Sequence, residues 1–427
     1  MRITIPRNRE QLKAHLRDPL FRNSYFLMAN RITGAGAGFV FWLIAARCYS
    51  PHEVGLANAI ISAMNLLVLF SALGFGFGII SYLPGENDKK GMVNSCFTIT
   101  GICSALLALM FVSGIPVWSP ALMIIRENTV LLICFILFTI AVSIFTLQSN
   151  VFVAFREAKY TFLQNFMGSI RIVILPFLMA LGISGIYISY GMGAVIAIIA
   201  GNLLIRRVFP EYNPVPVIKK RIINRMIGFS FGNYIAMILD GLPTVILPLL
   251  IVNTLGAEMN AYFFVAWAFA GLLLTIPDAT SLSLFAEGSH TPEDLRRNAV
   301  RSIKHTFLLL IPVIAVVFLF GKYMLLMFGK EYSENASGML TVLCLAGVPF
   351  SFNVIYVAIK RARKDIVPVI LVYGVVAVVT VVGGYLLMLE YGLIGIGYAW
   401  VMGHGVVAVG VVGNIWWKLG KSEIRSG

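Results

Sequence analysis

Twelve apolar runs, each about 20 residues or longer, follow one another along this 427-residue chain. A helix of about 20 apolar residues can cross the hydrocarbon core of a bilayer, so each run is long enough to be a span. Hydrophobic residues make up 59% of the chain and charged residues 12%, against about 45–50% and 25% in soluble domains. The sequence therefore predicts an all-α integral membrane protein. Its spans are expected at approximately residues 24–46, 54–82, 92–114, 129–152, 160–182, 184–206, 227–252, 259–284, 299–320, 335–358, 366–389 and 391–417.

Lys and Arg are concentrated in every second loop. With the N-terminus placed in the cytoplasm, about 27 of the 33 fall in inner segments, and the outer loops hold only Arg47, Arg126, Lys322 and Lys330. This is the positive-inside pattern, so we expect both termini to be cytoplasmic in a multi-pass protein of the cell membrane. Orientation and contact with anionic membrane lipids account for the net charge of +14 without a nucleic-acid partner.

A basic segment interrupted by prolines divides the spans into two groups of six. Six spans return each half to the same side, so the halves should be parallel repeats related by an axis along the membrane normal. A weak internal echo agrees with this, since Ser50-Pro-His-Glu-Val-Gly recurs as Leu255-Gly-Ala-Glu-Met-Asn. The predicted parts are a cytoplasmic basic N-terminal segment (1–23), an N-terminal six-helix lobe (24–208), a cytoplasmic linker (209–226), a C-terminal six-helix lobe (227–418) and a cytoplasmic tail (419–427).

The loops and cysteines argue against catalytic and metal-binding classes. The outer loops are too short for the domain that an extracellular glycan enzyme usually needs, and no pair of catalytic carboxylates is evident, so we expect no enzyme. The five cysteines match neither a zinc site nor a disulfide framework, and no cofactor or metal is expected. They are Cys48, Cys96, Cys103, Cys134 and Cys344.

Four charged residues interrupt the predicted spans: Arg31, Arg171, Asp240 and Asp278. A charge within the bilayer is costly, so each is a functional-site hypothesis by default. At about 1.5 Å per residue, Arg31 and Asp278 lie about 10 Å from the inner ends of their helices, whereas Arg171 and Asp240 lie near the midplane. Arg31 either snorkels to the inner interface or meets an anionic head group. Arg171 either forms a structural ion pair, with Asp240 as one candidate partner, or handles an anionic substrate.

The remaining polar and glycine-rich features of the spans each allow two interpretations. Asp240 and Asp278 either bind a coupling cation or proton or form structural pairs. His404 is either a satisfied histidine of the bundle or a proton relay. The runs Gly34–Gly38 and Gly74–Gly78 each contain G-x-x-x-G, which predicts close helix packing and also allows a hinge.

Helical spacing places the polar residues of three spans in stripes, which should face the bundle interior or a wet cavity because lipid cannot satisfy them. The stripes are Asn23, Asn30, Gly34 and Gly38 with Arg31 on their flank; Gln164, Gly168 and Arg171; and Ser230, Asn233, Asp240 and Thr244. The predicted substrate-binding residues of a central cavity are Arg31, Arg171, Asn30, Gln164 and Asn233.

The stretch from Asn30 to Pro84 resembles the first two helices of polysaccharide-biosynthesis flippases, which belong to the multidrug/oligosaccharidyl-lipid/polysaccharide exporter superfamily. Its most specific element is the turn A-R-x-Y-S-P-x-E-V-G, from Ala46 to Gly55. The resemblance implies a fold like that of MATE transporters, with two six-helix lobes around a cavity that opens alternately inward and outward. It also implies a lipid-linked oligosaccharide as substrate.

Two residue roles come from the resemblance alone. Related lipid II flippases place arginines on the first helix to meet a pyrophosphate, which implies that role for Arg31. Some relatives bind sodium through an Asp on the seventh helix with partners on helices eleven and twelve, and Asp240 matches in helix and depth. The eleventh span has no acidic residue, which puts that ion site in doubt.

The leading functional hypothesis is a flippase that moves a polyprenyl-phosphate-linked oligosaccharide from the inner to the outer leaflet by alternating access. Its partners would be the lipid-linked glycan, membrane lipids and the glycosyltransferases or polymerase of the same pathway. The runner-up is a cation- or proton-coupled multidrug antiporter, which would want acidic cavity groups. A membrane glycan polymerase or ligase, or a scaffold that recruits glycosyltransferases, explains the intramembrane charges less well.

Overall fold

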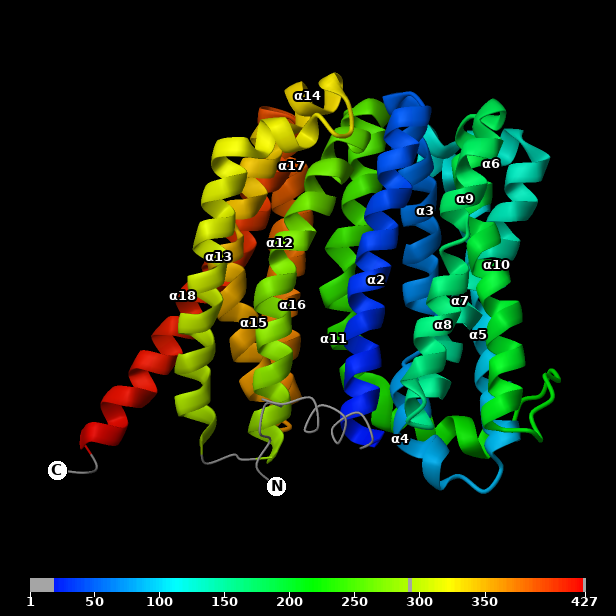
Figure 1. Cartoon of the computed structure of the whole chain (residues 1–427), viewed down its shortest axis with the longest axis horizontal. Helices are drawn as coiled ribbons and strands as arrows, with labels where there is room; N and C mark the ends of the chain where they lie inside the picture. Colours follow the sequence, from blue (N-terminus) through cyan, green and yellow to red (C-terminus); the bar gives the residue numbers. More distant parts are fainter. Residues whose placement is uncertain (1–18, 291–293, 425–427) are drawn as a thin grey trace, which may run out of the picture. The chain divides into compact units, whose positions relative to one another are not determined.

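Helices alone make up the regular structure in the part of the chain that the computed structural model describes, residues 19–290 and 294–424 (Figure 1). Side chains are described at residues 23, 25–226, 231–285, 287–288 and 294–413. Eleven helices in these residues are long and apolar enough to cross a membrane, and a bent pair supplies a twelfth span if its two parts are counted together. The all-α, multi-pass prediction is confirmed, whereas the side on which the termini lie stays a prediction.

The first half of the described chain contains α2 (Pro19–Cys48), α3 (Pro51–Ser71), α4 (Phe75–Tyr82), η1 (Leu83–Gly85), α5 (Lys89–Trp118), η2 (Pro120–Leu122), α6 (Ile124–Glu127), α7 (Thr129–Ala154), α8 (Ala158–Gly168), α9 (Arg171–Ile174), η3 (Leu175–Leu181) and α10 (Ile183–Val208). The second half contains α11 (Lys220–Thr254), α12 (Ala257–His290), α13 (Leu295–Leu325), α14 (Lys330–Leu345), α15 (Gly347–Ala362), α16 (Ile366–Val378), the π-helical η5 (Val379–Gly383), α17 (Gly384–Tyr391) and α18 (Leu393–Ile424).

Four predicted spans are not single uninterrupted α-helices, and one of them, 366–389, contains the π-helical η5 between α16 and α17. The run 54–82, predicted as one span, is divided into α3 and α4, because Leu73 and Gly74 adopt positive φ angles of 47° and 73° that no α-helix can continue through. The fifth span changes from α8 through α9 to the 3₁₀ helix η3, whose start contains Pro176. The predicted run 335–358 corresponds to α14 and α15, which meet at a bend of 42°.

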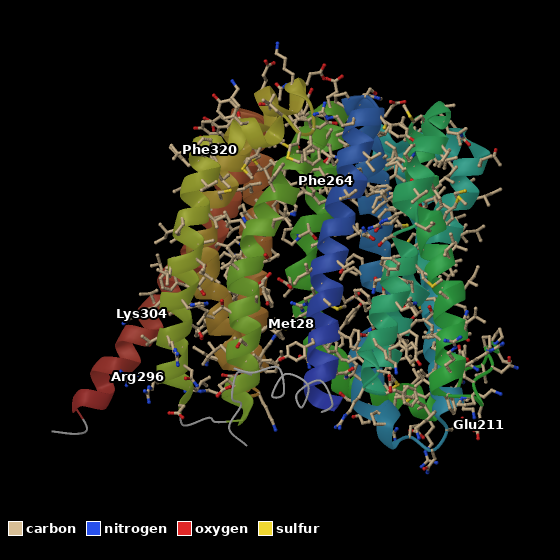
Figure 2. All side chains as sticks on the ribbon, in the orientation of Figure 1. Met28, Glu211, Phe264, Arg296, Lys304 and Phe320 are labelled. Atoms are coloured by element: carbon tan, nitrogen blue, oxygen red, sulfur yellow. The ribbon has the colours of Figure 1, made fainter. Side chains whose placement is uncertain are left out.

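Large apolar side chains are exposed along much of α13. They include Leu308, Ile311, Phe318 and Phe320, all more than half exposed. Figure 2 shows Arg296 and Lys304 toward one end of this helix and Phe320 toward the other. Burying these side chains in lipid removes the cost of exposing them to water, and the basic residues then lie at a membrane interface.

The described residues cluster into two compact units. Unit 1 comprises the described residues up to Cys48, with Leu67–Trp118 and Met123–Tyr234. Unit 2 comprises Tyr49–Leu66, Ser119–Leu122 and the described residues from Ile235 onward. The division therefore falls inside α3 and inside α11. The lobe boundaries 24–208 and 227–418 stay a prediction.

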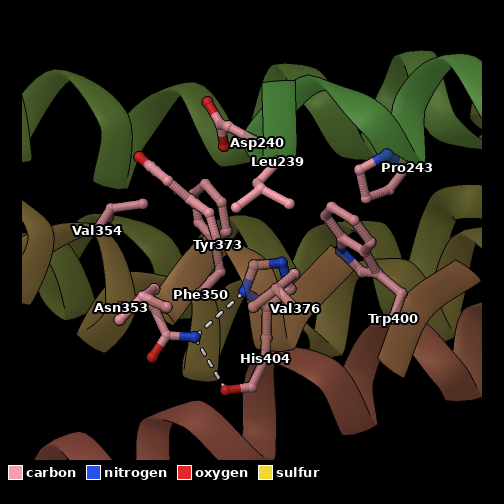
Figure 3. A pocket seen from close by; sticks show the side chains of 11 residues that line it. Leu239, Asp240, Pro243, Phe350, Asn353, Val354, Tyr373, Val376, Trp400 and His404 are labelled. Carbon is pink, nitrogen blue, oxygen red and sulfur yellow. Dashed lines mark hydrogen bonds between the residues drawn. The ribbon is translucent and has the colours of Figure 1, made fainter. Parts of the chain in front are cut away.

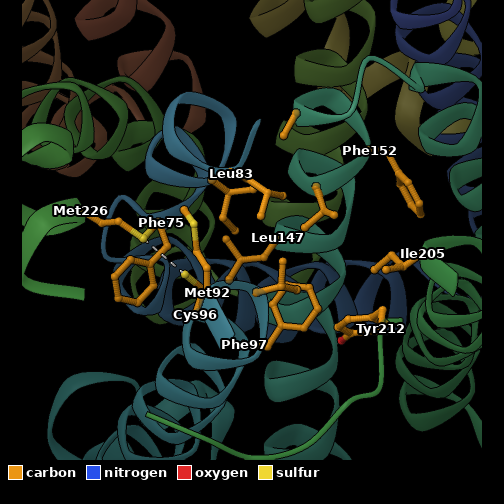
Figure 4. Close-up of a cluster of buried hydrophobic side chains, with 14 of the residues drawn as sticks. Phe75, Leu83, Met92, Cys96, Phe97, Leu147, Phe152, Ile205, Tyr212 and Met226 are labelled. Atoms are coloured by element: carbon orange, nitrogen blue, oxygen red, sulfur yellow. Dashed lines mark hydrogen bonds between the residues drawn. The ribbon is translucent and has the colours of Figure 1, made fainter. Parts of the chain in front are cut away.

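Unit 1 has an apolar core drawn from helices far apart in the sequence (Figure 4). Phe75 of α4, Cys96 of α5, Leu147 of α7 and Ile205 of α10 are each almost completely buried. The Cys96 Sγ lies 3.8 Å from the Sδ of Met226, which brings the start of α11 into the same cluster. Cys96 thus behaves as a small buried hydrophobe.

The segment 209–219, predicted as part of a linker, is attached to the first turns of α5. The Asn94 Nδ2 donates to the Asn213 carbonyl at 2.9 Å, and the Ser95 and Thr98 hydroxyls accept from the backbone N–H groups of Lys219 and Val217 at 3.0 and 3.2 Å. Lys219 also pairs with Asp88, and Arg225 with Glu86. These contacts place the segment within unit 1 as an ordered part of its surface.

Unit 2 contains a close helix contact between the start of α3 and the start of α12. A Cβ built at Gly55 would overlap the backbone carbonyl of Ala257, so only glycine allows this approach. The fully buried Asn260 donates through Nδ2 to the Gly55 carbonyl at 2.7 Å and to the Asn58 Oδ1 at 3.3 Å. The two segments in contact are the two copies of the sequence echo.

Candidate functional sites in the two units

Arg171 lies at the break in the fifth span, in unit 1, where α8 has ended and α9 begins. Its guanidinium carbon lies 4.7 Å from the centre of the Tyr190 ring and 5.3 Å from that of Phe41. Among the described residues its Nε has no hydrogen-bond partner, and none of the ion pairs includes it. The structural ion pair considered for Arg171 is therefore not formed within the described part of unit 1.

Gln164, seven residues before Arg171, is engaged in a buried polar network. Its Nε2 donates to the Gln148 Oε1 at 2.7 Å, and its Oε1 accepts from the Ser149 hydroxyl at 3.2 Å. Gln148 continues the network to the Asn202 Oδ1 at 3.1 Å, and a Cβ at Gly201 would collide with both glutamines. These contacts join α7, α8 and α10, so a substrate-binding role for Gln164 stays a prediction.

The polar residues of α2 differ in whether their side chains are hydrogen-bonded or exposed. The Asn23 Oδ1 accepts from the Ala158 N–H at 2.7 Å at the start of α8, whereas the buried Asn30 Oδ1 has no hydrogen-bond partner in the part of the chain that the structure describes. Arg31 is exposed. Asn30 and Arg31 thus remain available for a ligand, and their predicted roles stay predictions.

The glycine run of α2 has no close neighbour within the described part of unit 1. A Cβ built at Gly34, Gly36 or Gly38 would meet no atom within 4 Å. No described residue of unit 1 therefore packs closely on Gly34–Gly38, and the close packing expected at this run stays a prediction. In the second run, Gly76 does lie against a neighbour, the side chain of Asn150.

Unit 2 holds a pocket of about 30 Å³ beside Asp240 (Figure 3). Its polar lining consists of Asp240 on α11, Asn353 on α15, Tyr373 on α16 and His404 on α18, and apolar side chains complete it. A volume of this size has room for about one water molecule. Asp240 is exposed at this wall, whereas Asn353 and His404 are buried.

His404 is held in one orientation by Asn353. The Asn353 Nδ2 lies 3.2 Å from the His404 Nδ1 and 2.9 Å from the His404 carbonyl oxygen. An amide N–H donates, so Nδ1 accepts and the neutral ring carries its proton on Nε2, which has no partner among the described residues. Phe350 and Trp400 pack edge-on to the ring. Both readings of His404, bundle residue and proton relay, therefore remain open.

Two further charges act on this pocket. The Arg361 guanidinium lies 5.8 Å from the Tyr373 ring centre, and its positive charge also acts on Asp240. The negative charge of Asp278 acts on Tyr373. Asp240, Asp278 and Arg361 thus share one electrostatic environment around Tyr373.

The residues around Asp240 do not fit the sodium site that the resemblance implies. A hard cation needs several oxygen ligands. The pocket offers side-chain oxygens from Asp240, Asn353 and Tyr373 only, and the N–H of His404 repels a cation. No group of three His, Cys, Asp or Glu suited to a metal occurs among the described residues.

Asn233, the remaining predicted ligand, lies on α11 in unit 1, on the other side of the unit boundary from Asp240. It is half-buried. Its substrate-binding role stays a prediction.

Four residues beside Arg171 or Asp240 could not be predicted from the sequence: Phe41, Tyr190, Asn353 and Tyr373. The one available signal was general, because a cation deep in a span needs a carboxylate or an aromatic face nearby. Aromatic residues are too frequent in the spans for that signal to select two of them.

The helices define a multi-pass membrane protein. The profile of the family described as "Polysaccharide biosynthesis protein" matches residues 20–239, just over half of the chain, and the MatE profile matches residues 249–386. The chain belongs to the polysaccharide biosynthesis protein family.

Solved structures with this fold include both transporters and a flippase. An inward-facing multidrug resistance MATE family transporter of the MOP superfamily has a TM-score of 0.70 at 16% identity, covering 92% of this chain and 95% of that chain. The lipid II flippase MurJ, in an inward closed conformation, has a TM-score of 0.70 at 15% identity, covering 92% and 87%. A MOP superfamily transporter from Pyrococcus furiosus has a TM-score of 0.58 at 15% identity, covering 97% and 96%. At these identities the likeness shows the fold alone.

Among curated proteins, an uncharacterized membrane protein of Methanocaldococcus jannaschii is 25% identical over 239 residues. The match covers 50% of this chain and 45% of that protein, so the chain aligns with less than half of this relative.

Proposed function

We propose that this protein is a flippase that moves a polyprenyl-phosphate-linked oligosaccharide from the inner to the outer leaflet. Family membership supports a role in polysaccharide biosynthesis. The observation that carries the proposal is Arg171, a cation in the middle of a 24-residue span with no ion pair among the described residues. An uncompensated positive charge at this depth suits an anionic substrate that supplies the missing charge on arrival.

In this mechanism the glycan head group crosses through a polar cavity while the polyprenyl tail stays in the bilayer. Arg31, exposed on α2, meets the phosphate first, and Arg171 receives it deeper in the membrane. An anion leaving a negative interior moves with the electric field, which contributes about 2.3 kcal/mol per charge per 100 mV. The membrane potential can therefore drive outward transfer without ATP.

The test is transfer of a fluorescent polyprenyl-pyrophosphate-linked glycan in proteoliposomes, read by quenching of the outer leaflet. The double variant Arg31→Ala/Arg171→Ala should lose transfer, because neither α2 nor the fifth span then offers the phosphate the arginine proposed to bind it. Arg126→Ala, which removes an exposed arginine from α6, is the matched control and should transfer at the rate of the unchanged protein. Transfer by the double variant at that same rate would remove Arg31 and Arg171 from the substrate path.

A second candidate, a cation-coupled multidrug antiporter, is favoured by one observation. Asp240 is an exposed carboxylate in unit 2, and a cationic drug would require an accessible negative charge. Expression in a drug-sensitised strain separates the candidates: the flippase proposal predicts no change in resistance to cationic drugs. Resistance that depends on Asp240 would favour the antiporter instead.

A further inference from the structure

We propose that Phe41 and Tyr190 are positioning residues that hold Arg171 as a preformed binding group for a phosphate. This inference rests on the proposed function for the identity of the lipid that carries the phosphate. Three features of unit 1 support it: the fixed stem of Arg171, the two aromatic faces around its guanidinium, and the lack of a competing carboxylate.

The stem of Arg171 is fixed by a close contact between α8 and α10. A Cβ built at Gly193 would lie 2.5 Å from the Gly168 carbonyl oxygen, 3.0 Å from the Arg171 Cβ and 3.4 Å from the Arg171 Cδ. The missing side chain of Gly193 thus leaves the space that the first carbons of Arg171 fill. This contact sets the direction in which the side chain leaves the helix.

The guanidinium then lies against two aromatic rings that also contact each other. Phe41 is fully buried, and its ring centre lies 6.1 Å from that of Tyr190 in an edge-to-face arrangement. An aromatic face attracts a cation through its quadrupole, and the attraction is strongest where water is excluded. The rings therefore stabilise the charged side chain in the span without neutralising it.

This difference from an ion pair decides what the site can bind. A carboxylate partner would cancel the charge of Arg171 and occupy the N–H groups that a ligand needs. The planar guanidinium instead keeps its charge, and its fork of N–H donors matches two oxygens of a phosphate. A neutral sugar gains far less from such a group, so the site selects the phosphate or pyrophosphate of the substrate.

Variants that keep or remove each aromatic ring separate a positioning role from a role in general packing. Tyr190→Phe keeps the ring, whereas Tyr190→Leu removes it at similar volume, and Phe41→Leu does the same for the second ring. Phe166→Leu is the matched control, because Phe166 stacks on Phe162 of the same helix, whereas the Arg171 guanidinium lies over Phe41 and Tyr190. All variants are first compared by thermal stability and by elution as a single species in detergent.

Binding is measured with geranylgeranyl diphosphate as the probe and with geranylgeraniol as its uncharged counterpart. A cation–π contact of this kind is worth about 1–2 kcal/mol, or roughly 5- to 30-fold in affinity. Tyr190→Leu and Phe41→Leu should weaken diphosphate binding by that factor and leave geranylgeraniol binding unchanged. Tyr190→Phe and Phe166→Leu should bind the diphosphate as the unchanged protein does.

Transfer assays on the same variants should show a raised KM for the lipid-linked glycan with the maximal rate largely kept. Diphosphate binding that is unaffected by Tyr190→Leu, Phe41→Leu and Arg171→Ala overturns the inference. Equal loss in Tyr190→Phe and Tyr190→Leu also overturns it, since the hydroxyl would then be the active group. If the diphosphate binds as expected but no lipid-linked glycan is transferred, the proposed function fails and the anion site stands.

Discussion

Asn260 shows how much one residue can matter in a membrane helix pair. Its amide is fully buried in unit 2 and donates to the Gly55 carbonyl at 2.7 Å. Within a bilayer the Asn58 Oδ1 has no water to replace the donor that Asn260 supplies, so losing this amide is costly. Asn260 and the close backbone approach at Gly55 therefore hold the starts of α3 and α12 together.

We expect Asn260→Ala to lower the free energy of unfolding by about 1–3 kcal/mol, the cost of leaving a buried polar group unpaired. The measurement is the melting temperature of the purified protein in detergent. Asn335→Ala is the control, because the Asn335 side chain bonds only to the Glu331 carbonyl within its own helix and is exposed. Equal melting temperatures for Asn260→Ala and Asn335→Ala would contradict a structural role for the buried amide.

Residue-scale features were the hardest to predict from the sequence. Arg31 and Arg171 were singled out because they interrupt apolar runs, and their depths in the membrane stay predictions. The rings of Phe41 and Tyr190 were not singled out, because they come from helices some 150 residues apart in the chain, at a distance that helical periodicity does not report. Gln164 was expected in the cavity but bonds to Gln148, since the stripe rule does not tell a neighbouring helix from water.

At the scale of whole elements, the break between α3 and α4 depends on one glycine. Gly74 has a φ of 73°, in the left-handed region that a residue with a Cβ enters at a cost of roughly 1 kcal/mol or more. We expect Gly74→Ala to lower the melting temperature relative to Gly85→Ala. A Cβ at Gly85 meets no atom within 4 Å, and its φ is not in the positive range. Identical melting temperatures for the two variants would show that the break does not need glycine.

The segment 209–219 provides an element-scale prediction that depends on pH. The hydrogen bond and charge of Lys219, with the Gly91 N–H, lower the pKa of the Asp88 carboxyl. A lowered pKa in the folded state means that the ionised carboxylate stabilises the fold above its unfolded pKa of about 3.9 and loses this effect as the pH falls through the folded value. Asp88→Asn should therefore melt earlier than the unchanged protein at pH 7, and the difference should shrink below about pH 4.

The control for Asp88 is Glu127→Gln, which alters an exposed carboxylate that has no ion pair among the described residues. Its melting temperature should follow that of the unchanged protein at every pH. A gap between Asp88→Asn and the unchanged protein that is as large at pH 3 as at pH 7 would assign the effect to something other than the ionised carboxylate.

Hydropathy predicted the elements well and their interruptions poorly. The number of spans was found because length and apolar content decide it. The division of 54–82 at Leu73 and Gly74 was missed, because a glycine-rich apolar run satisfies the same length rule whether or not its backbone stays helical. The attachment of the segment 209–219 to α5 was also not predicted. Its hydrogen bonds come from Asn94, Ser95 and Thr98, which lie more than 100 residues earlier in the chain.

At the scale of the molecule, the orientation is the prediction that most needs a measurement. Glu127 and Glu211 are both exposed, the first predicted outside and the second, labelled in Figure 2, predicted inside. Each is replaced by cysteine in a background without the five native cysteines. A membrane-impermeant maleimide should label Glu127→Cys in intact cells and Glu211→Cys only after permeabilisation. The reverse pattern would invert the topology and the direction of the proposed transfer.

The contact between Asn58 and Asn260 has a consequence for the order of synthesis. The two residues are 202 positions apart, and translation at about 5–20 residues per second needs about 10–40 s to cover that distance. During this interval the start of α3 is already made, with its Gly55 carbonyl and Asn58 amide still lacking Asn260. The nascent first half therefore carries an unfinished polar surface until α12 arrives, and a membrane chaperone or insertase has that interval in which to shield it.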